Sequence, residues 1–300
     1  MANDSHFGGV RHIIDGDGLE LNVLEAGQGP VIVFVHGFPD THAVWLTTIA
    51  RLVDDFRCLA YDVRGAGESG VPASQEGYLV SHLVSDLVAV VNLLSPGRPV
   101  HLVGHDWGSV QAWQAVLLAG SDPRLRGRIA SYTSISGPSL GHFGAWTRRA
   151  RQGSWSQRQE VVRQMAHSWY ILAFQLPLLP ELALRRLLRG PESTRRFLGS
   201  RHAKPTVARD AVNGLGLYRA NLHHGLRERY SLRTDIPVQL IVPLRDPYIT
   251  PAVYDDLSRF CSRLTRHDID AGHWVQQSHP DEVAQLIADF VLTHEAASPG

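Results

Sequence analysis

One carboxylate in the sequence stands where it could attack a carbon atom. Asp106 lies within Gly104-His105-Asp106-Trp107-Gly108, after the apolar run PVHLVG and before the helical pattern SVQAWQAVLLA. A strand, a tight glycine-flanked turn and a helix form the context of a nucleophile elbow, whose central side chain projects above the sheet edge. A carboxylate is already an anion at neutral pH, so it can displace at carbon and form an alkyl ester. The alternative interpretation of Asp106 is a helix N-cap.

Asp246 and His273 complete a set in the order nucleophile, acid and histidine. Asp246 follows VQLIV and His273 follows RHDID, so both come just past predicted strand ends, where parallel sheets gather their sites. The chain has 16 histidines, so position, rather than residue type, singles out His273. Asp268 is the other candidate acid, but it lies inside a strand run and is less able to reach the histidine.

The motif His36-Gly37-Phe38-Pro39 directly follows the apolar run VIVFV. A loop leaving the strand here would bring the amide of Phe38 opposite the amide of Trp107. Two converging N–H groups form an oxyanion hole, and Pro39 stiffens the loop. An ordinary Gly-Pro turn is the alternative for this motif alone.

Two kinds of pattern alternate along most of the chain: short apolar runs and helical repeats. This alternation predicts an α/β fold with a mostly parallel sheet flanked by helices, and VIVFV suits a strand buried on both faces. The predicted strands are Leu19–Leu24, Val31–Val35, Arg57–Tyr61, Val100–Val103, Ile129–Ile135, Val238–Val242 and Thr265–Ile269. The predicted helices include Leu79–Leu94, Ser109–Ala119 and Asp281–Leu292.

The alternation stops between Pro138 and Thr234, where prolines interrupt helical patterns and no good strand run occurs. We therefore predict a core formed by residues 1–137 and 235–300 and an inserted helical cap, or lid, formed by residues 138–234. A chain of 300 residues with 44% hydrophobic residues is large enough for this arrangement.

Charge is unevenly distributed, although 29 basic residues balance 29 acidic ones. The predicted cap contains 17 lysines and arginines against five aspartates and glutamates. Such a segment is typical of a solvated helical surface facing an acidic core, but it also fits an anionic substrate, partner or membrane surface. The basic residues are scattered without interleaved aromatic residues, so nucleic-acid binding is not expected.

The sequence lacks the features of membrane-spanning, secreted, metal-binding and disulfide-rich proteins. No apolar run is long enough for a transmembrane segment, and the N-terminus MANDSHFGG does not resemble a signal peptide. The two cysteines, Cys58 and Cys261, form no CxxC pattern, so neither a metal site nor a disulfide framework is expected. A reduced, cytoplasmic location is the expectation.

Together the motifs resemble those of the epoxide hydrolase branch of the α/β-hydrolase superfamily. HGFP, DVRGAGES at Asp62–Ser69, GHDWG and AGHW match in order and span nearly the whole chain. In detail the chain resembles the hydrolase half of bacterial proteins in which such a domain is fused to a short-chain reductase. Ser109 stands where glycine is more usual after GHDWG, and its small side chain is expected to be tolerated.

The resemblance also implies two cap tyrosines that donate hydrogen bonds to the epoxide oxygen. Tyr170 stands four residues before a Phe-Gln pair and a proline, and Tyr218 is followed by arginine late in the cap, as in the family. An alkoxide is a poor leaving group, whereas a phenol keeps its proton at neutral pH and can stabilise the developing charge. Tyr230 and Tyr248 are alternatives for the second donor.

The function implied is hydrolysis of a small epoxide to a vicinal diol through an ester on Asp106, with His273 and Asp246 activating water and no cofactor or metal. We expect a largely apolar substrate and a possible homodimer. The residues expected to bind substrate are His36, Pro39, Trp169 and Trp274. Apolar cap residues that suggest the pocket are Phe143, Trp146, Trp155, Leu176 and Leu178.

Two other functions remain open. A haloalkane dehalogenase uses the same aspartate ester chemistry, and Trp107 with Trp169 could hold a halide, although Phe38 stands where that family often has asparagine. A non-catalytic hydrolase-fold protein would only bind a ligand, but such proteins often lose part of the catalytic set. A serine esterase is disfavoured, because no GxSxG motif stands at the elbow.

Overall fold

An eight-stranded sheet forms the centre of the protein. The computed structural model describes residues 9–198, 206–222 and 233–295. The strand order is β1-β2-β4-β3-β5-β6-β7-β8; β2 is antiparallel to both neighbours, and all pairings from β4 to β8 are parallel. The strands are β1 (Val10–Asp15), β2 (Glu20–Ala26), β3 (Val31–Val35), β4 (Arg57–Tyr61), β5 (Val100–His105), β6 (Ile129–Ile135), β7 (Val238–Pro243) and β8 (Leu264–Ile269). The expected mostly parallel sheet is confirmed.

Strand β1 was not predicted from the sequence. It is an edge strand that pairs only with β2, and four of its six side chains are exposed. Val10 and Ile13, for example, are exposed to solvent. An edge strand that buries so little lacks the apolar run that marks the central strands.

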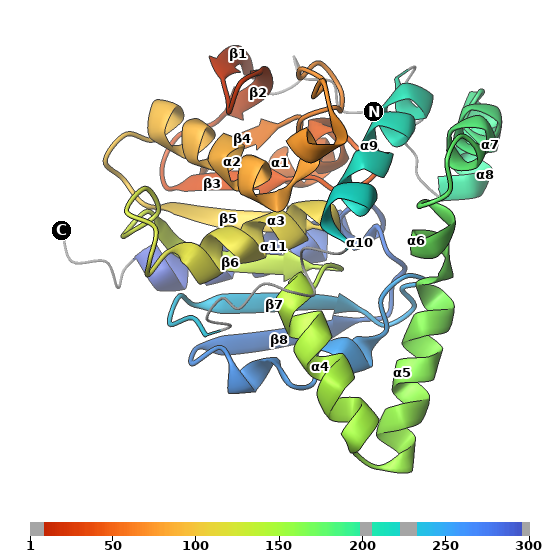
Figure 1. The fold of residues 1–300 in the computed structure, drawn as a ribbon. Coiled ribbons are helices and arrows are strands. Elements are labelled where there is room, and N and C mark those ends of the chain that lie inside the picture. The colour runs from red at the N-terminus through yellow and green to blue at the C-terminus, as the bar shows by residue number, and fades with distance from the viewer. Residues whose placement is uncertain (1–8, 199–205, 223–232, 296–300) are drawn as a thin grey trace.

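Helices cover both faces of the sheet (Figure 1). One face carries α2 (Val80–Leu94) and α3 (Trp107–Leu118); the other carries α1 (Leu46–Ile49), α10 (Val275–Ser278) and α11 (Pro280–Glu295). Within β3, Val31, Val33 and Val35 pack into the first layer. Ile32 and Phe34 pack into the second. Alternate side chains of a strand point to opposite faces, so this central strand has to be apolar throughout.

Between β6 and β7, the described residues form six helices that lie beside the sheet (Figure 1). They are α4 (Leu140–Gln152), α5 (Trp155–His167), α6 (Trp169–Ala173), α7 (Leu179–Leu187), α8 (Pro191–Leu198) and α9 (Val207–Asn221). The division into a core of residues 1–137 and 235–300 and a cap of 138–234 stays a prediction. In the described part of the chain, no helix has the length and apolar character to span a membrane.

Helix α9 is fixed to the core at its C-terminal end. The side chain of Asn221 accepts a hydrogen bond from the amide of Val80 at 2.9 Å and donates to the carbonyl of Tyr78 at 2.8 Å. All three residues are buried, so the backbone groups at the start of α2 are satisfied by a residue of the inserted segment. This contact positions α9, which carries Tyr218, against the core.

A buried ion pair holds the loop after β4, on which α9 also rests. The guanidinium of Arg64 donates to both carboxylate oxygens of Asp86 on α2, each at 2.6 Å, and both side chains are almost fully buried. Its neighbour Gly65 has φ +83°, which favours glycine. Asn213 of α9 donates to the carbonyl of Gly65 at 2.9 Å. The bidentate pair therefore fixes the loop against which α9 packs.

The variant Arg64→Met should lose about 3–5 kcal/mol of unfolding free energy, because Asp86 would remain buried without its partner. Urea unfolding followed by circular dichroism measures the loss. The control Arg124→Met breaks an exposed pair with Asp122 and should change stability by less than about 1 kcal/mol. Equal losses in the two variants would contradict the importance assigned to the buried pair.

Candidate active site

Asp106 occupies a sharp turn between β5 and α3. Its backbone has φ +53° and ψ −122°, a conformation that L-residues rarely adopt. The turn is possible because its neighbours are small: a Cβ on Gly108 would collide with the backbone of Val35, and one on Gly37 would collide with Asp106 itself. Asp106 stands at the N-cap position of α3, but its side chain makes no capping hydrogen bond to the helix, so capping does not account for this side chain.

The two oxygens of the Asp106 carboxylate have different surroundings. Oδ1 accepts a hydrogen bond from the Phe38 amide at 2.7 Å, and the Trp107 amide also bonds the carboxylate. Oδ2 lies 3.7 Å from Nε2 of His273. Burial raises the pKa of Asp106, although His273 and the two amides oppose the rise. The amides of Phe38 and Trp107 therefore converge where an oxyanion could be held.

His273 and Asp246 form a buried pair next to Asp106. Nδ1 of His273 lies 2.8 Å from Oδ2 of Asp246, whose Oδ1 accepts hydrogen bonds from the amides of Tyr248 and Ile249 at 2.8 and 3.2 Å. Burial opposes the charge of His273, but Asp246 and then Asp106 raise its pKa above the ordinary value. This arrangement turns Nε2 of His273 toward Asp106 and makes it a stronger base.

Asp268, the alternative acid, lies on β8 with an exposed side chain. It pairs with Arg266 at 2.7 Å. The preference for Asp246 over Asp268 therefore agrees with the geometry of the histidine pair.

Two residues that sequence reasoning did not single out hold the backbone of His273. Nε2 of His105 lies 3.0 Å from the carbonyl oxygen of His273, and the hydroxyl of Ser136 donates to the same oxygen at 3.3 Å. Burial, together with the neighbouring His273, holds the pKa of His105 well below its ordinary value. His105 is thus a neutral donor, and its place in GHDWG was the available signal.

The two tyrosines predicted in the cap lie together above Asp106. Tyr170 of α6 and Tyr218 of α9 pack edge to face, with ring centroids 5.9 Å apart. The ring of Trp107 packs edge-on against the ring of Tyr218, with the centroids 5.1 Å apart. Burial raises the pKa of each tyrosine, and the Asp106 charge adds to the rise. Both phenols therefore keep their protons and remain donors.

Arg219 joins the segment of Tyr170 to the helix of Tyr218. Its guanidinium donates to the carbonyls of Phe174 and Leu176 at 2.8 and 2.7 Å, and it pairs with Glu181 at 2.7 Å. The residue after Tyr218 thus fixes the end of α6 and the turn that follows.

A cavity of about 680 Å³ extends from this cluster into the cap. Asp106, His273, Tyr170 and Tyr218 line its inner end, with Tyr248 beside them. Apolar cap residues form much of its wall: Ala173, Phe174, Leu176, Leu179, Ala183, Leu184, Leu187, Leu188 and Leu198. Such a cavity is suited to an apolar ligand whose polar group lies at the inner end.

Three of the four residues expected to bind substrate line this cavity: Pro39, Trp169 and Trp274. His36 does not. Its ring is buried, and Nε2 accepts a hydrogen bond from the Val63 amide at 2.8 Å, so it supports the loop after β4. The expectation for His36 is corrected, because its ring nitrogens are used inside the core.

A smaller cavity of about 150 Å³ shares Asp106, Tyr170 and Tyr218 with the large one. Phe143 lines the smaller cavity, whereas Leu176 lines the larger. The other apolar cap residues named from the sequence lie elsewhere: Trp146 is buried in the cap, and Trp155 and Leu178 are exposed.

Tyr248, an alternative second donor, packs against the ring of His273, with the centroids 4.8 Å apart, whereas Tyr230 lies outside the described residues.

Within the residues that the structure describes, no three His, Cys, Asp or Glu side chains are grouped so as to hold a metal ion.

A family model described as alpha/beta hydrolase fold matches residues 30–280. Probable oxidoreductase EphD of Mycobacterium tuberculosis is 36% identical over 296 residues, which cover 94% of this chain but only 49% of EphD, so the chain spans about half of that relative. Epoxide hydrolase A of the same organism is 27% identical over 329 residues, covering 94% and 97% of the two chains. The Bacillus megaterium epoxide hydrolase in complex with an inhibitor shares the fold, with a TM-score of 0.76, 24% identity and coverage of 93% and 99%.

The variant Asp246→Asn should lower the pKa of His273, because it removes the nearest negative charge that favours the imidazolium. Titration of the histidine ring signals by NMR measures the change. Asp268→Asn removes a carboxylate of the same type at a site not bonded to His273 and should leave the titration unchanged. An unaltered His273 midpoint in Asp246→Asn would contradict the assignment.

Proposed function

We propose that this protein, which belongs to the alpha/beta hydrolase fold family, hydrolyses an epoxide to a vicinal diol through an ester on Asp106. One observation carries the proposal: a carboxylate and two protonated phenols line the same end of one apolar cavity. Opening an epoxide needs a nucleophile at carbon and a hydrogen-bond donor at oxygen. The Asp106, Tyr170 and Tyr218 side chains supply these groups.

In the first step, Oδ2 of Asp106 attacks an epoxide carbon and the bond from that carbon to the ring oxygen breaks. The electron pair moves to the ring oxygen, which takes a proton from Tyr170 or Tyr218 while the other phenol stabilises the developing charge. The proton that the regenerated Asp106 carboxyl releases at the end of the second step restores that phenol. Oδ1 stays on the Phe38 amide and becomes the carbonyl oxygen of the ester. The freer environment of Oδ2 supports this choice of attacking atom.

In the second step, His273 removes a proton from a water molecule that attacks Cγ of the Asp106 ester. The tetrahedral oxyanion forms at Oδ1, which faces the amides of Phe38 and Trp107. Collapse breaks the bond from Cγ to the alkyl oxygen, and His273 returns a proton to the departing diol. Asp246 orients the ring throughout and stabilises the imidazolium.

The dehalogenase alternative receives less support. A halide would need a second N–H donor beside the indole of Trp107, but the Phe38 side chain has none and the side chain of Trp169 is 67% exposed. The retention of nucleophile, acid and histidine also argues against a protein that only binds its ligand.

We propose an apolar small-molecule epoxide as the substrate, because the cavity wall is mostly aliphatic. A cytoplasmic location is proposed on the cysteines alone: Cys58 and Cys261 are both free and buried. A homodimer also stays a proposal from the sequence.

Intact-protein mass of His273→Gln after incubation with a panel of epoxides tests the function. The ester should form but hydrolyse slowly, so the mass should rise by one whole epoxide. Asp106→Asn in the same background should abolish the adduct. An adduct of an alkyl group without its halogen, from a parallel haloalkane panel, would establish a dehalogenase instead. No adduct from either panel, with an inactive wild type, would sink the proposal for these substrates.

Single substitutions Tyr170→Phe and Tyr218→Phe should each slow ester formation by roughly a hundred-fold, because each removes a donor to the ring oxygen. Rapid-quench single-turnover measurements separate ester formation from its hydrolysis, which should change much less. Tyr254→Phe is a matched control, since Tyr254 is a buried tyrosine outside both cavities. If Tyr170→Phe and Tyr218→Phe slowed ester formation and ester hydrolysis equally, the result would argue against activation of the epoxide oxygen by the tyrosines.

A further inference from the structure

A continuous row of apolar side chains faces solvent along α5 and α6. Val162, Met165, Trp169 and Leu172 recur at intervals of three and four residues, which places them on one helical face. Their exposed fractions are 70%, 38%, 67% and 69%. Only Ser168, with φ −95° and ψ 7°, separates the two helices, so the face runs across the joint.

The exposed apolar surface continues through the turn into α7. Leu176, Leu178, Leu179 and Leu182 are 48%, 71%, 62% and 64% exposed. Leu178 has φ +64°, which is unfavourable for leucine, and its exposed side chain gains little packing in return. Together these four residues, the row on α5 and α6, and Leu187 are called the outer cap face. Helices α5, α6 and α7 follow one another along one side of the molecule (Figure 1).

The large cavity opens within the outer cap face. Trp169, Leu176, Leu179 and Leu187 line the cavity and are also exposed, Leu187 by 41%. The same side chains therefore form the rim through which a ligand would pass. Contiguous apolar surface around a cavity mouth marks an interaction site rather than ordinary surface.

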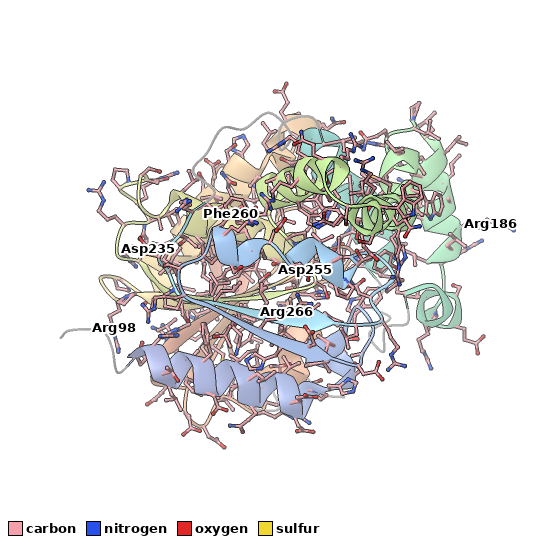
Figure 2. All side chains as sticks on the ribbon, turned by 90° about the horizontal axis from the view of Figure 1, so that it is seen from below. Arg98, Arg186, Asp235, Asp255, Phe260 and Arg266 are labelled. Atoms are coloured by element: carbon pink, nitrogen blue, oxygen red, sulfur yellow. The ribbon has the colours of Figure 1, made fainter. Side chains whose placement is uncertain are left out.

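The charged side chains around the outer cap face are mostly positive. The exposed arginines between Trp155 and Gly190 are Arg158, Arg163, Arg185, Arg186 and Arg189. Neither acidic residue of that stretch is fully exposed: Glu181 is paired with Arg219 at 2.7 Å, and Glu160 lies 4.0 Å from Arg163. Figure 2 shows Arg186 at the outer edge of the cap, at the opposite end of the molecule from Arg98. Leucine and tryptophan flanked by arginine are typical of surfaces that bind anionic lipid.

We propose that the outer cap face docks on an anionic lipid bilayer, with the cavity mouth directed into the lipid. A second copy of this chain is less favoured as the occupant, because it would oppose arginines to arginines and close the mouth. A bilayer satisfies both features, since it offers negative headgroups to the arginines and an apolar phase to the mouth. If the proposed epoxide chemistry holds, the substrate enters from the membrane without crossing water.

Co-sedimentation with vesicles tests the docking without any epoxide, so its failure would not bear on the proposed function. Wild-type protein should bind vesicles of phosphatidylcholine mixed with phosphatidylglycerol and release them as salt is raised. The double variant Leu172→Gln with Leu178→Gln should bind at least about ten-fold more weakly. Neither residue lines the cavity, so turnover of a water-dispersed epoxide should be unchanged.

Matched controls separate the outer cap face from general surface effects. Leu93→Gln with Leu292→Gln removes leucines of similar exposure, 57% and 54%, from α2 and α11 and should leave binding unchanged. Arg163→Gln with Arg186→Gln should weaken binding by roughly five-fold per arginine, whereas Arg98→Gln with Arg126→Gln should have a much smaller effect.

Three results would overturn the proposal. The first is recovery of all the wild-type protein in the supernatant after sedimentation of the mixed vesicles. Alternatively, the Leu172/Leu178 variant and its Leu93/Leu292 control could bind equally well. The third result is a wild-type dimer in sedimentation velocity that becomes a monomer in the double variant Leu172→Gln with Leu178→Gln. This result would assign the outer cap face to a second copy of the chain.

Discussion

The site depends on one crowded turn, in which the backbone of Asp106 adopts a positive φ between β5 and α3. Gly108 lets α3 begin against the backbone of β3, and Gly37 lets the Phe38 amide reach the carboxylate. A larger side chain at either glycine would separate the nucleophile from its oxyanion donors. The strain is held by packing on both sides of the sheet, which is why the conformation persists at a position that local preference disfavours.

Asp246, His273 and Asp106 are three largely buried ionisable groups that lie next to one another, so the charge of each affects the pKa of its neighbour. Asp246 keeps a lowered pKa because His273 and two backbone amides offset its burial, and so it stays negative. That charge, with the charge of Asp106, keeps the pKa of His273 high enough for a useful base. When Asp106 becomes an ester its charge disappears, so His273 loses one source of this support and returns its proton more readily.

The central strands, the sheet and the positions of Asp106, Asp246 and His273 just past strand ends were predictable, because each follows from a local apolar run or a turn at its end. The roles of these three side chains stay proposals. The α/β-hydrolase superfamily expected from HGFP, GHDWG and AGHW is confirmed by the match over residues 30–280. The sequence could not show that His36, unlike its neighbour Pro39, does not line the cavity. A tertiary contact with the Val63 amide decides which way the His36 ring faces. The roles of Arg219 and of the outer cap face also depend on how distant helices meet, which residue spacing does not encode.

The unequal surroundings of the two Asp106 oxygens have a consequence for the protein's own atoms. On the proposed route the diol carries away Oδ2 at each turnover, and an oxygen from water takes its place. Oδ1 remains bonded to the Phe38 amide and never leaves. A working molecule would thus renew one oxygen of a single side chain at every turnover while keeping the other from the time of its synthesis. In water enriched in heavy oxygen, one turnover would therefore label Asp106 at one of its two oxygens only.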